Sequence, residues 1–310
     1  MKTAFIFPGQ GAQYVGMAQD YIAAKPEFAK VLKGFDAAHG TQLEIIMREG
    51  PEDRLKETSM TQPAILFHSI CALKCFNEVC KLKPDFVAGH SLGEFSALVA
   101  NGSLEWKDAL HLVHKRGEFM IKANQGKPFA MAAVIGLNYK SVIEVCHEAE
   151  GAGLVRAVNF NTPIQTVISG SAQGVETASA LAKEHGAKRV IPLVVGGPFH
   201  TPMIDLASVW LREEMEKVSF KDGQVPLVSN FDSRPATSGE ESRAKLVRQV
   251  VSPVLWVQSV QYMIEQGVRR FIEFGPQKVL SGMIKNIDKD AVILNLDKLE
   301  ELGALSGLLD

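Results

Sequence analysis

The sequence predicts an α/β fold with a mostly parallel β-sheet and a smaller domain inserted into the larger one. Short apolar runs typical of strands alternate with stretches of helical period along the chain. Residues 127–195 have a different order of elements from their surroundings, and glycine and proline flank them on both sides. With 310 residues, of which 46% are hydrophobic, the chain can build a substantial core.

The first part of the chain alternates between strand and helix. Its predicted elements are a strand over 3–7, a long apolar helix over 63–80, a strand over 85–88, and helices over 92–101 and 104–123. The first strand ends in a Pro-Gly-Gln-Gly turn. Such alternation is what a parallel sheet requires, because each parallel connection crosses over the sheet.

The middle of the chain is predicted to form the inserted domain. Its expected elements are a strand over 130–136, a helix over 141–149, strands over 154–159 and 165–170, a helix over 172–185 and a strand over 189–195. The order β-α-β-β-α-β is that of ferredoxin-like domains. Helices and strand-like runs at 227–230 and 270–274 follow, so the large domain is expected to comprise 1–126 and 196–310, and the small one 127–195.

Charge and cysteine content argue against several classes of protein. The formal net charge is −2, so no overall basic field draws the chain to nucleic acid or to an anionic membrane. The N-terminus lacks the features of a signal peptide, and no apolar stretch approaches the roughly 20 residues of a membrane span. The four cysteines form no CxxC pair, and burial as small hydrophobes explains them better than metal ligation. We expect a cytoplasmic monomer without a metal.

The clearest functional signal is Gly89-His90-Ser91-Leu92-Gly93, which fits the pattern G-x-S-x-G. An apolar strand precedes it and a helical run follows, which is the context that this pattern requires. The glycines permit a sharp turn, so the Ser91 hydroxyl would be exposed and the N–H of Leu92 would point where an oxyanion forms. A capping box between Ser91 and Glu94, at the start of an inert helix, is the alternative interpretation.

A serine nucleophile needs a base, and eight histidines compete for that role. His200 differs from the others because it lies in a loop just after a predicted strand, where α/β proteins usually carry catalytic groups. A solvated loop histidine is the alternative interpretation. His111, His114, His147 and His185 fall in predicted helices and are expected to be surface or core groups.

Two further features point to the same site. The turn at 9–11 is not a dinucleotide loop, because Tyr14 stands where that pattern needs glycine, but it can offer the N–H of Gln10 to an oxyanion. Arg116 lies on the apolar stripe of the predicted helix over 104–123, so its guanidinium must pair with a structural carboxylate or with a ligand. The spacing alone favours a structural salt bridge.

The ordered motifs resemble the malonyl-CoA:acyl carrier protein transacylase family. They are Phe7-Pro8-Gly9-Gln10-Gly11, Thr61-Gln62-Pro63-Ala64, Gly89-His90-Ser91-Leu92-Gly93-Glu94, Arg116-Gly117, Phe199-His200 and Glu273-Phe274-Gly275-Pro276. The resemblance runs from about residue 2 to residue 285. It implies a hydrolase-like α/β core with a ferredoxin-like small domain. The implied activity is transfer of a malonyl group from malonyl-CoA to the phosphopantetheine thiol of acyl carrier protein, in fatty acid biosynthesis.

The resemblance also implies catalytic roles for individual residues. Ser91 would be the nucleophile and His200 the base. The backbone N–H groups of Gln10 and Leu92 would form the oxyanion hole. A backbone carbonyl orients the histidine in this family, in place of an aspartate, and the matching position is Gln249.

The implied substrate contacts centre on Arg116, which would grip the malonyl carboxylate. Gln62 would line the pocket, and Phe199 would wall the side of the α-carbon. Asn159 and Asn161 resemble asparagines near the family's site. No cofactor is implied, because coenzyme A arrives as the thioester substrate and phosphopantetheine is carried by the partner protein.

Other functions remain open from the sequence. A serine hydrolase, such as a thioesterase or esterase, uses the same elbow, although the missing acid partner, the inserted domain and Arg116 argue against it. A non-catalytic carrier-binding module would never acquire an acyl group on Ser91. A transferase serving polyketide synthesis or a malonate decarboxylase complex is not separated from one serving fatty acid synthesis.

Overall fold

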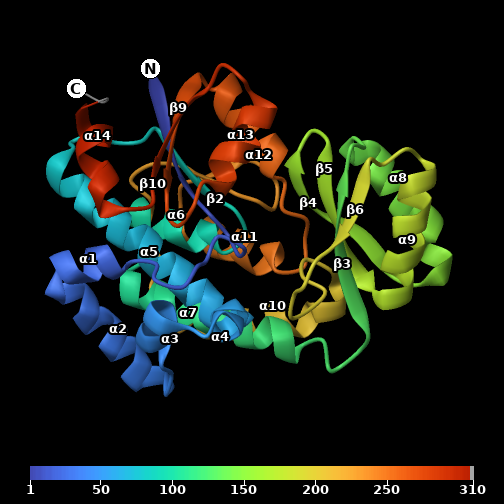
Figure 1. Cartoon of the computed structure of the whole chain (residues 1–310), viewed down its shortest axis with the longest axis horizontal. Helices are drawn as coiled ribbons and strands as arrows, with labels where there is room; N and C mark the ends of the chain where they lie inside the picture. The colour runs from blue at the N-terminus through green and yellow to red at the C-terminus, as the bar shows by residue number, and fades with distance from the viewer. Residues whose placement is uncertain (308–310) are drawn as a thin grey trace.

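Two β-sheets organise the chain in the computed structural model, which describes residues 1–307 (Figure 1). The larger sheet has six strands, in the order β10 (Val292–Leu296), β9 (Val268–Phe274), β1 (Lys2–Phe7), β2 (Phe86–Gly89), β7 (Leu227–Val228) and β8 (Pro235–Ala236). Neighbouring strands are parallel except at one edge, where β7 and β8 are antiparallel. The predicted α/β fold with a mostly parallel sheet is confirmed.

Helices cover both faces of the six-stranded sheet. They are α5 (Thr58–Val79) and α6 (Gly93–Ala100) on one face, and α12 (Trp256–Glu265) and α13 (Val279–Ile287) on the other. Helix α7 (Trp106–Lys122) packs against α5 and α6. Helices on both faces are the usual arrangement for a parallel sheet, because its connections must cross over it.

The central strand β1 is buried on both of its faces. Phe5 and Phe7 pack with side chains of α5 and α6, whereas Ala4 and Ile6 pack with those of α12 and α13. Successive side chains of a strand point to opposite faces. The continuous apolar run of β1 therefore fills both halves of the core, and the chain leaves the sheet at the turn that carries Gln10.

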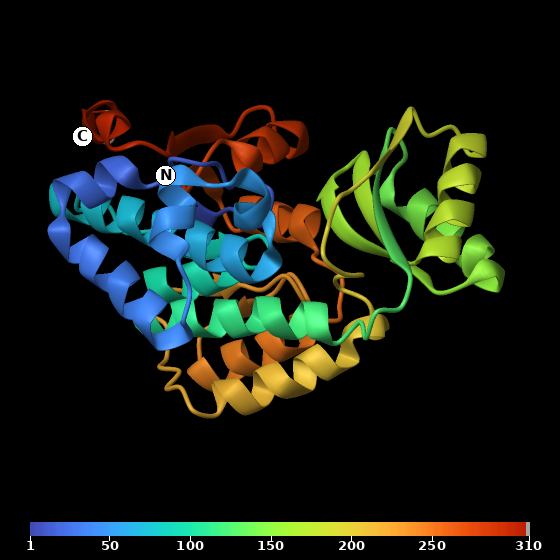
Figure 2. The ribbon, with the colours of Figure 1, turned by 60° about the horizontal axis from the view of Figure 1, so that its bottom comes forward.

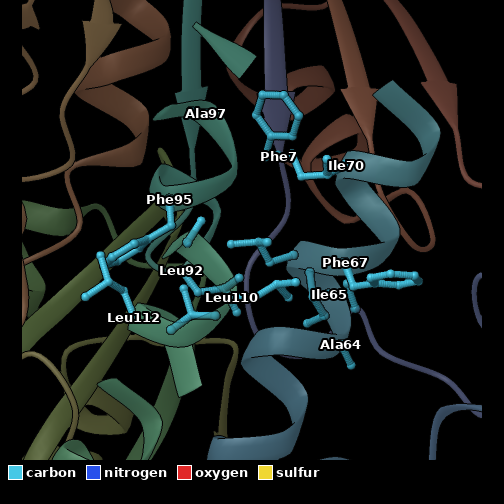
Figure 3. Packing of buried hydrophobic residues seen from close by; sticks show 14 of the residues in the cluster. Phe7, Ala64, Ile65, Phe67, Ile70, Leu92, Phe95, Ala97, Leu110 and Leu112 are labelled. Carbon is cyan, nitrogen blue, oxygen red and sulfur yellow. The ribbon is translucent and has the colours of Figure 1, made fainter. Parts of the chain in front are cut away.

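Packing between α6 and α7 supports the turn that precedes α6. Figure 3 shows Leu92 and Phe95 close to Leu110 and Leu112 of α7, and all four side chains are buried. Burying a leucine or phenylalanine side chain contributes about 1.5–3 kcal/mol. The apolar contacts thus hold the start of α6, and with it the turn at Ser91, in one position.

The smaller sheet has four antiparallel strands, in the order β4 (Val155–Thr162), β5 (Gln165–Ser171), β3 (Phe129–Ile135) and β6 (Arg189–Pro192). Helices α8 (Tyr139–Ala149) and α9 (Ala172–Glu184) pack on it around a core of its own, which includes Val134, Val142 and Ile168. The elements follow in the predicted order β-α-β-β-α-β. Figure 2 shows this sheet and its helices set to one side of the larger sheet.

Helix α5 begins at Thr58, five residues before the predicted start at Pro63. Proline is usual in the first turn of a helix, but here it lies deeper, where its missing N–H leaves the carbonyl of Ser59 without an intrahelical donor. Nδ1 of His114 in α7 lies 2.9 Å from that carbonyl oxygen. The bond from α7 therefore satisfies the group that Pro63 leaves open, which makes the proline tolerable inside the helix.

Two predicted strands end earlier than expected. Strand β6 ends at Pro192 rather than at residue 195. The N–H of Leu193 still donates to the carbonyl of Met131 in β3, and Leu193 and Val195 line a cavity. Strand β7 ends at Val228 rather than at residue 230, because the side chain of Asn230 turns to hydrogen-bond the turn around Ser91.

The remaining elements surround the larger sheet or connect its parts, except η1 (Glu150–Ala152), which lies between α8 and β4 and packs with α8 and α9. They are α1 (Gln19–Ala24), α2 (Pro26–His39), α3 (Leu43–Glu49), α4 (Glu52–Lys56), α10 (Asp205–Met215), α11 (Gly239–Gln249), α14 (Leu302–Gly307) and the 3₁₀ helices η1, η2 (Pro202–Ile204) and η3 (Leu299–Glu301). Within residues 1–307, no helix combines the length and apolar composition needed to cross a membrane.

Candidate active site

Ser91 lies on a tight turn between β2 and α6. Its φ angle is 52°, in the left-handed region that few residues other than glycine adopt. Glycine is required on both sides: a Cβ on Gly89 would lie 2.0 Å from the backbone of Gly93, and one on Gly93 would lie 2.1 Å from the carbonyl oxygen of Phe7. The two glycines let strand, turn and helix approach closely, and this is the strained geometry of a nucleophile elbow.

The Ser91 hydroxyl faces two nitrogen groups. Its Oγ lies 3.0 Å from Nε2 of His200 and 2.9 Å from Nη2 of Arg116. It does not cap α6, which has no side-chain cap, and the carboxylate of Glu94 points inward. The capping-box interpretation of Ser91 and Glu94 is therefore wrong, because both side chains have partners from distant parts of the chain.

His200 is buried, and both of its ring nitrogens have hydrogen-bond partners. Nδ1 lies 2.9 Å from the backbone oxygen of Gln249 and Nε2 lies 3.0 Å from Ser91 Oγ. Gln249 is the last residue of α11, where carbonyl groups lack an intrahelical partner. The carbonyl can only accept, so Nδ1 carries the hydrogen and Nε2 is free to accept the serine proton. The alternative of a solvated loop histidine is wrong.

The charge state of His200 follows from its surroundings. Burial, followed by the positive charge of Arg116, lowers the pKa of His200 from 6.5 to about 3. Both effects disfavour the imidazolium. His200 is therefore neutral near pH 7, which is the form that accepts a proton.

Arg116 is buried with only neutral hydrogen-bond partners among the described residues. Nη1 donates to Oε1 of Gln62 over 2.8 Å, and Nη2 donates to Ser91 Oγ and, over 3.1 Å, to Oε1 of Gln249. The expected structural salt bridge is wrong, because no carboxylate within residues 1–307 comes within ion-pair distance of this guanidinium. Burial lowers the pKa of Arg116 to about 10, so it remains charged.

A cavity of about 230 Å³ opens onto this group of side chains. The predicted residues that line it are Gln10, Gln62, Ser91, Leu92, Arg116, Asn159, Asn161, Phe199 and His200. Other walls come from strands of the smaller sheet and from α13, through apolar side chains such as Met131, Val167 and Met283. The cavity therefore lies between the two sheets. The apolar walls carry no chemical signature in the sequence, and no motif identifies them.

The turns after β1 and β2 lie at the same edge of the larger sheet. The two strands are parallel neighbours, with Phe7 opposite Gly89, and His90 N donates to the carbonyl of Phe7 over 3.0 Å. This arrangement brings Gln10 and Leu92 to one side of Ser91, as expected for carboxyl ends of adjacent parallel strands. Within residues 1–307, neither backbone N–H has a hydrogen-bond acceptor, and both residues line the cavity.

The smaller sheet touches the elbow through β4. Oδ1 of Asn161 lies 2.9 Å from Nε2 of His90, and Asn159 pairs with Val254 in an isolated β-bridge. The predicted asparagines thus lie where the two sheets meet.

Asn230 is a site residue that sequence patterns did not identify. Its Oδ1 accepts from the N–H of Ser91 and its Nδ2 donates to the carbonyl of Gly89, each over 2.7 Å. The side-chain amide therefore braces the elbow on both sides of His90. Only its position at the end of a strand-like run could have suggested this role.

The arrangement suits acyl transfer through a serine ester. It combines a half-buried serine hydroxyl on a strained turn, a neutral imidazole whose Nε2 can accept a proton, backbone N–H groups without an acceptor and a buried cation beside the hydroxyl. Among residues 1–307, no three His, Cys, Asp or Glu side chains are placed to hold a metal ion together.

The sequence is similar to those of known proteins over nearly the whole chain. Residues 4–296 match the family described as "Acyl transferase domain". The malonyl CoA-acyl carrier protein transacylase of Bacillus subtilis is 44% identical over 289 residues, which cover 93% of this chain and 91% of that protein. The enzyme of the same name from Escherichia coli K12 is 41% identical over 309 residues, which cover 100% and 99%.

Solved structures of similar proteins have the same fold. The acyl-carrier-protein S-malonyltransferase of Burkholderia pseudomallei superimposes with a TM-score of 0.94 at 39% identity, covering 99% of this chain and 100% of that one. A malonyl-transacylase in complex with a type II PKS acyl-carrier protein gives 0.94 at 36% identity, with coverage of 99% and 100%. This chain therefore belongs to the malonyl CoA-acyl carrier protein transacylase family of acyl transferase domains.

Proposed function

We propose that this enzyme moves a malonyl group from malonyl-CoA to the phosphopantetheine thiol of an acyl carrier protein, through an ester on Ser91. The observation that carries the proposal is the position of Ser91 Oγ, which is in hydrogen-bond contact with both a neutral His200 and a buried Arg116. The names of the relatives support the choice of donor and acceptor. The role in fatty acid biosynthesis is part of the same proposal.

The first half-reaction forms the ester. Nε2 of His200 accepts the proton of Ser91 as Oγ attacks the thioester carbonyl. The N–H groups of Gln10 and Leu92 are placed to stabilise the oxyanion, each by about 3 kcal/mol. The tetrahedral intermediate then collapses, the C–S bond breaks, and His200 returns the proton to the departing coenzyme A thiolate.

The second half-reaction reverses these roles. The thiol of the carrier's phosphopantetheine gives its proton to His200 while its sulfur attacks the ester carbonyl. The C–O bond to Ser91 breaks, and the serine oxygen recovers a proton from His200. Two products leave in turn from one covalent intermediate, so the kinetics are ping-pong.

Arg116 explains the preference for an acyl group that ends in a carboxylate. Its Nη2 lies 2.9 Å from Ser91 Oγ, so an anion bound to the guanidinium lies only a short distance from the ester carbonyl, as in malonyl. Gln62 holds the other terminal nitrogen. A paired carboxylate would favour malonyl over acetyl by about 1.5–3 kcal/mol.

The domain organisation forms part of the proposal. We place the boundaries of a small domain near residues 127 and 195, around the four-stranded sheet. Numbered along the chain, its strands lie in the order 2-3-1-4, which supports a ferredoxin-like fold. The parallel sheet with a serine elbow after β2 supports a hydrolase-like description of the rest.

Intact-mass measurement tests the function directly. After incubation with malonyl-CoA, the wild-type protein should gain one malonyl mass, which a holo acyl carrier protein then removes. Ser91→Ala should gain none, whereas the matched control Ser208→Ala, outside the site on α10, should behave like the wild type. Rapid release of free malonate without an acceptor thiol would instead identify a hydrolase. An unmodified wild-type protein would overturn the proposal.

A further inference from the structure

Arg116 has no anion in direct contact among the described residues. Its partners Gln62, Ser91 and Gln249 are all neutral. A buried guanidinium without a compensating charge is costly. The electrostatic partner that raises its pKa is the carboxylate of Glu94 on α6, a side chain with no exposed surface.

The amide of Gln249 connects the two charges. Its Oε1 accepts from Arg116 Nη2 over 3.1 Å, and its Nε2 donates to Oε2 of Glu94 over 2.8 Å. The N–H of Asn230 donates to the same carboxylate oxygen over 3.1 Å. Only one orientation of the Gln249 amide places its acceptor toward the cation and its donor toward the anion. The geometry therefore defines Glu94 as a counter-ion that acts through one intervening amide.

A bound malonyl group adds a second carboxylate to this buried site. Two anions would then share the single charge of Arg116 in surroundings from which water is largely excluded, and their repulsion is poorly screened. We propose that Glu94 makes the preference for malonyl depend on pH: it is the counter-ion of Arg116 in the free enzyme and takes up a proton from solvent when the substrate carboxylate binds. The proton returns to solvent when the malonyl group leaves on the carrier. This inference rests on the proposed function of Arg116.

Glu94 is the group best suited to take up that proton. Burial raises its pKa from 4.5 to about 7, while the hydrogen bonds from Gln249 and Asn230 and, to a smaller extent, the charge of Arg116 oppose this rise. Neutralising Arg116 with a second carboxylate removes the contribution of that charge and raises the pKa of Glu94 further. The substrate carboxylate stays ionised because it contacts the guanidinium directly.

His200 and Arg116 keep their charge states between pH 6 and pH 8.5. Burial lowers the pKa of His200 to about 3, so it stays neutral, and burial also lowers the pKa of His90 from its usual value. Arg116 stays protonated, since its pKa is about 10. A change in selectivity over this range is therefore assigned to Glu94.

The test compares malonyl-CoA with acetyl-CoA as donors at each pH. Both share the thioester, the nucleophile and the base, so the ratio of their kcat/KM values cancels effects on these. For the wild type, the malonyl-to-acetyl ratio should rise at least about five-fold from pH 8.5 to pH 6, because proton uptake and malonyl binding favour each other. A ratio that stays constant over this range overturns the inference.

Variants identify the group responsible. Glu94→Gln keeps an oxygen that can accept from Gln249 and Asn230 but carries no charge, so its ratio should be high and independent of pH. Glu118→Gln is the matched control, since Glu118 lies on α7 close to Arg116 but has a side chain 43% exposed, and it should keep the wild-type dependence. An unchanged slope in Glu94→Gln overturns the inference.

A calorimetric measurement covers the case in which Glu94→Gln does not fold. Binding of malonyl-CoA to Ser91→Ala at pH 7, in two buffers of different ionisation enthalpy, should show net uptake of a fraction of a proton, and acetyl-CoA should show none. Equal values for the two donors overturn the inference. Its failure is distinct from failure of the proposed function: in the first case Ser91 still acquires a malonyl ester, and in the second it does not.

Discussion

Nδ1 of His200 donates to the backbone carbonyl of Gln249 over 2.9 Å, so the last carbonyl of α11 orients the imidazole. A carbonyl fixes the tautomer, as an aspartate would, but adds no negative charge that stabilises the imidazolium. This agrees with the direction in which burial and Arg116 move the pKa of His200, down to about 3. The base therefore stays neutral over a wide range of pH.

The rate of acylation by acetyl-CoA should accordingly depend little on pH below pH 7.5. An exposed histidine with a pKa of 6.5 would lose activity about ten-fold for each pH unit below that value. With the pKa of His200 at about 3, kcat/KM for acetyl-CoA should change less than about two-fold between pH 7.5 and pH 5. Single-turnover acylation by acetyl-CoA, followed at several pH values across this range, measures the change in kcat/KM. Acetyl-CoA is the suitable donor because it lacks the carboxylate that is linked to Glu94. A tenfold fall by pH 5.5 would contradict the assigned charge state.

Replacement of Arg116 should remove the preference for malonyl. Arg116→Ala deletes the group that pairs with the carboxylate, and the malonyl-to-acetyl ratio of kcat/KM should fall about 10- to 150-fold. Arg116→Lys should recover only part of the preference for malonyl, since an ammonium cannot make a bidentate contact with the carboxylate. Arg212→Ala, an exposed position on α10, is the matched control and should keep the wild-type ratio. An unaltered ratio in Arg116→Ala would show that the carboxylate is recognised elsewhere.

Phe199 should limit the size of the acyl group. Its side chain is 7% exposed and lines the cavity next to the base. We expect Phe199→Leu to lower the malonyl-to-methylmalonyl ratio of kcat/KM about ten-fold, because one methyl group in a tight pocket is worth about 1–3 kcal/mol. Competition between the two donors, read by intact mass, gives the ratio. If the ratio matches that of the wild type, Phe199 does not contact the α-carbon.

The titration of His39, which lies in a cluster of histidines outside the site, should make stability depend on pH. His39 of α2 lies against His111 and His114 of α7, with His39 Nε2 3.3 Å from Nδ1 of His111. Burial, followed by the charges of His114 and His111, lowers the pKa of His39 from 6.5 to about 4. The unfolded chain therefore binds this proton at higher pH than the folded one, and stability is lost as pH falls from 6.5 toward 4.

Urea denaturation at several pH values measures this effect. The free energy of unfolding should fall by up to about 1.4 kcal/mol per pH unit through the titration of His39. His39→Gln should show a smaller slope between pH 6.5 and pH 4.5. The control His147→Gln changes a side chain that is 67% exposed and should leave the slope as it is. A wild-type slope in His39→Gln would rule out a linked proton at this position.

Local sequence patterns were sufficient for many of the elements and for the turn at Ser91. The apolar run of β1, the helical period of α7 and the pentapeptide around Ser91 are contiguous in the chain, and each depends on interactions among near neighbours. The α/β class and the order of elements in residues 127–195 followed from the same patterns. The position of His200 after a strand was likewise a local signal, and the structure brings it to Ser91.

Only the tertiary structure decided which partners these groups have. The stripe of α7 showed that Arg116 is buried, but its partners Gln62 and Gln249 are 54 and 133 residues away in the sequence, and both are neutral where a salt bridge was expected. Glu94 has the spacing of a capping box, yet its carboxylate bonds to Asn230 and Gln249 instead. Side-chain pairing of this kind depends on which segments the two sheets bring together. No pattern of neighbouring residues contains that information, because the contacts are made between surfaces that exist only after the chain has folded.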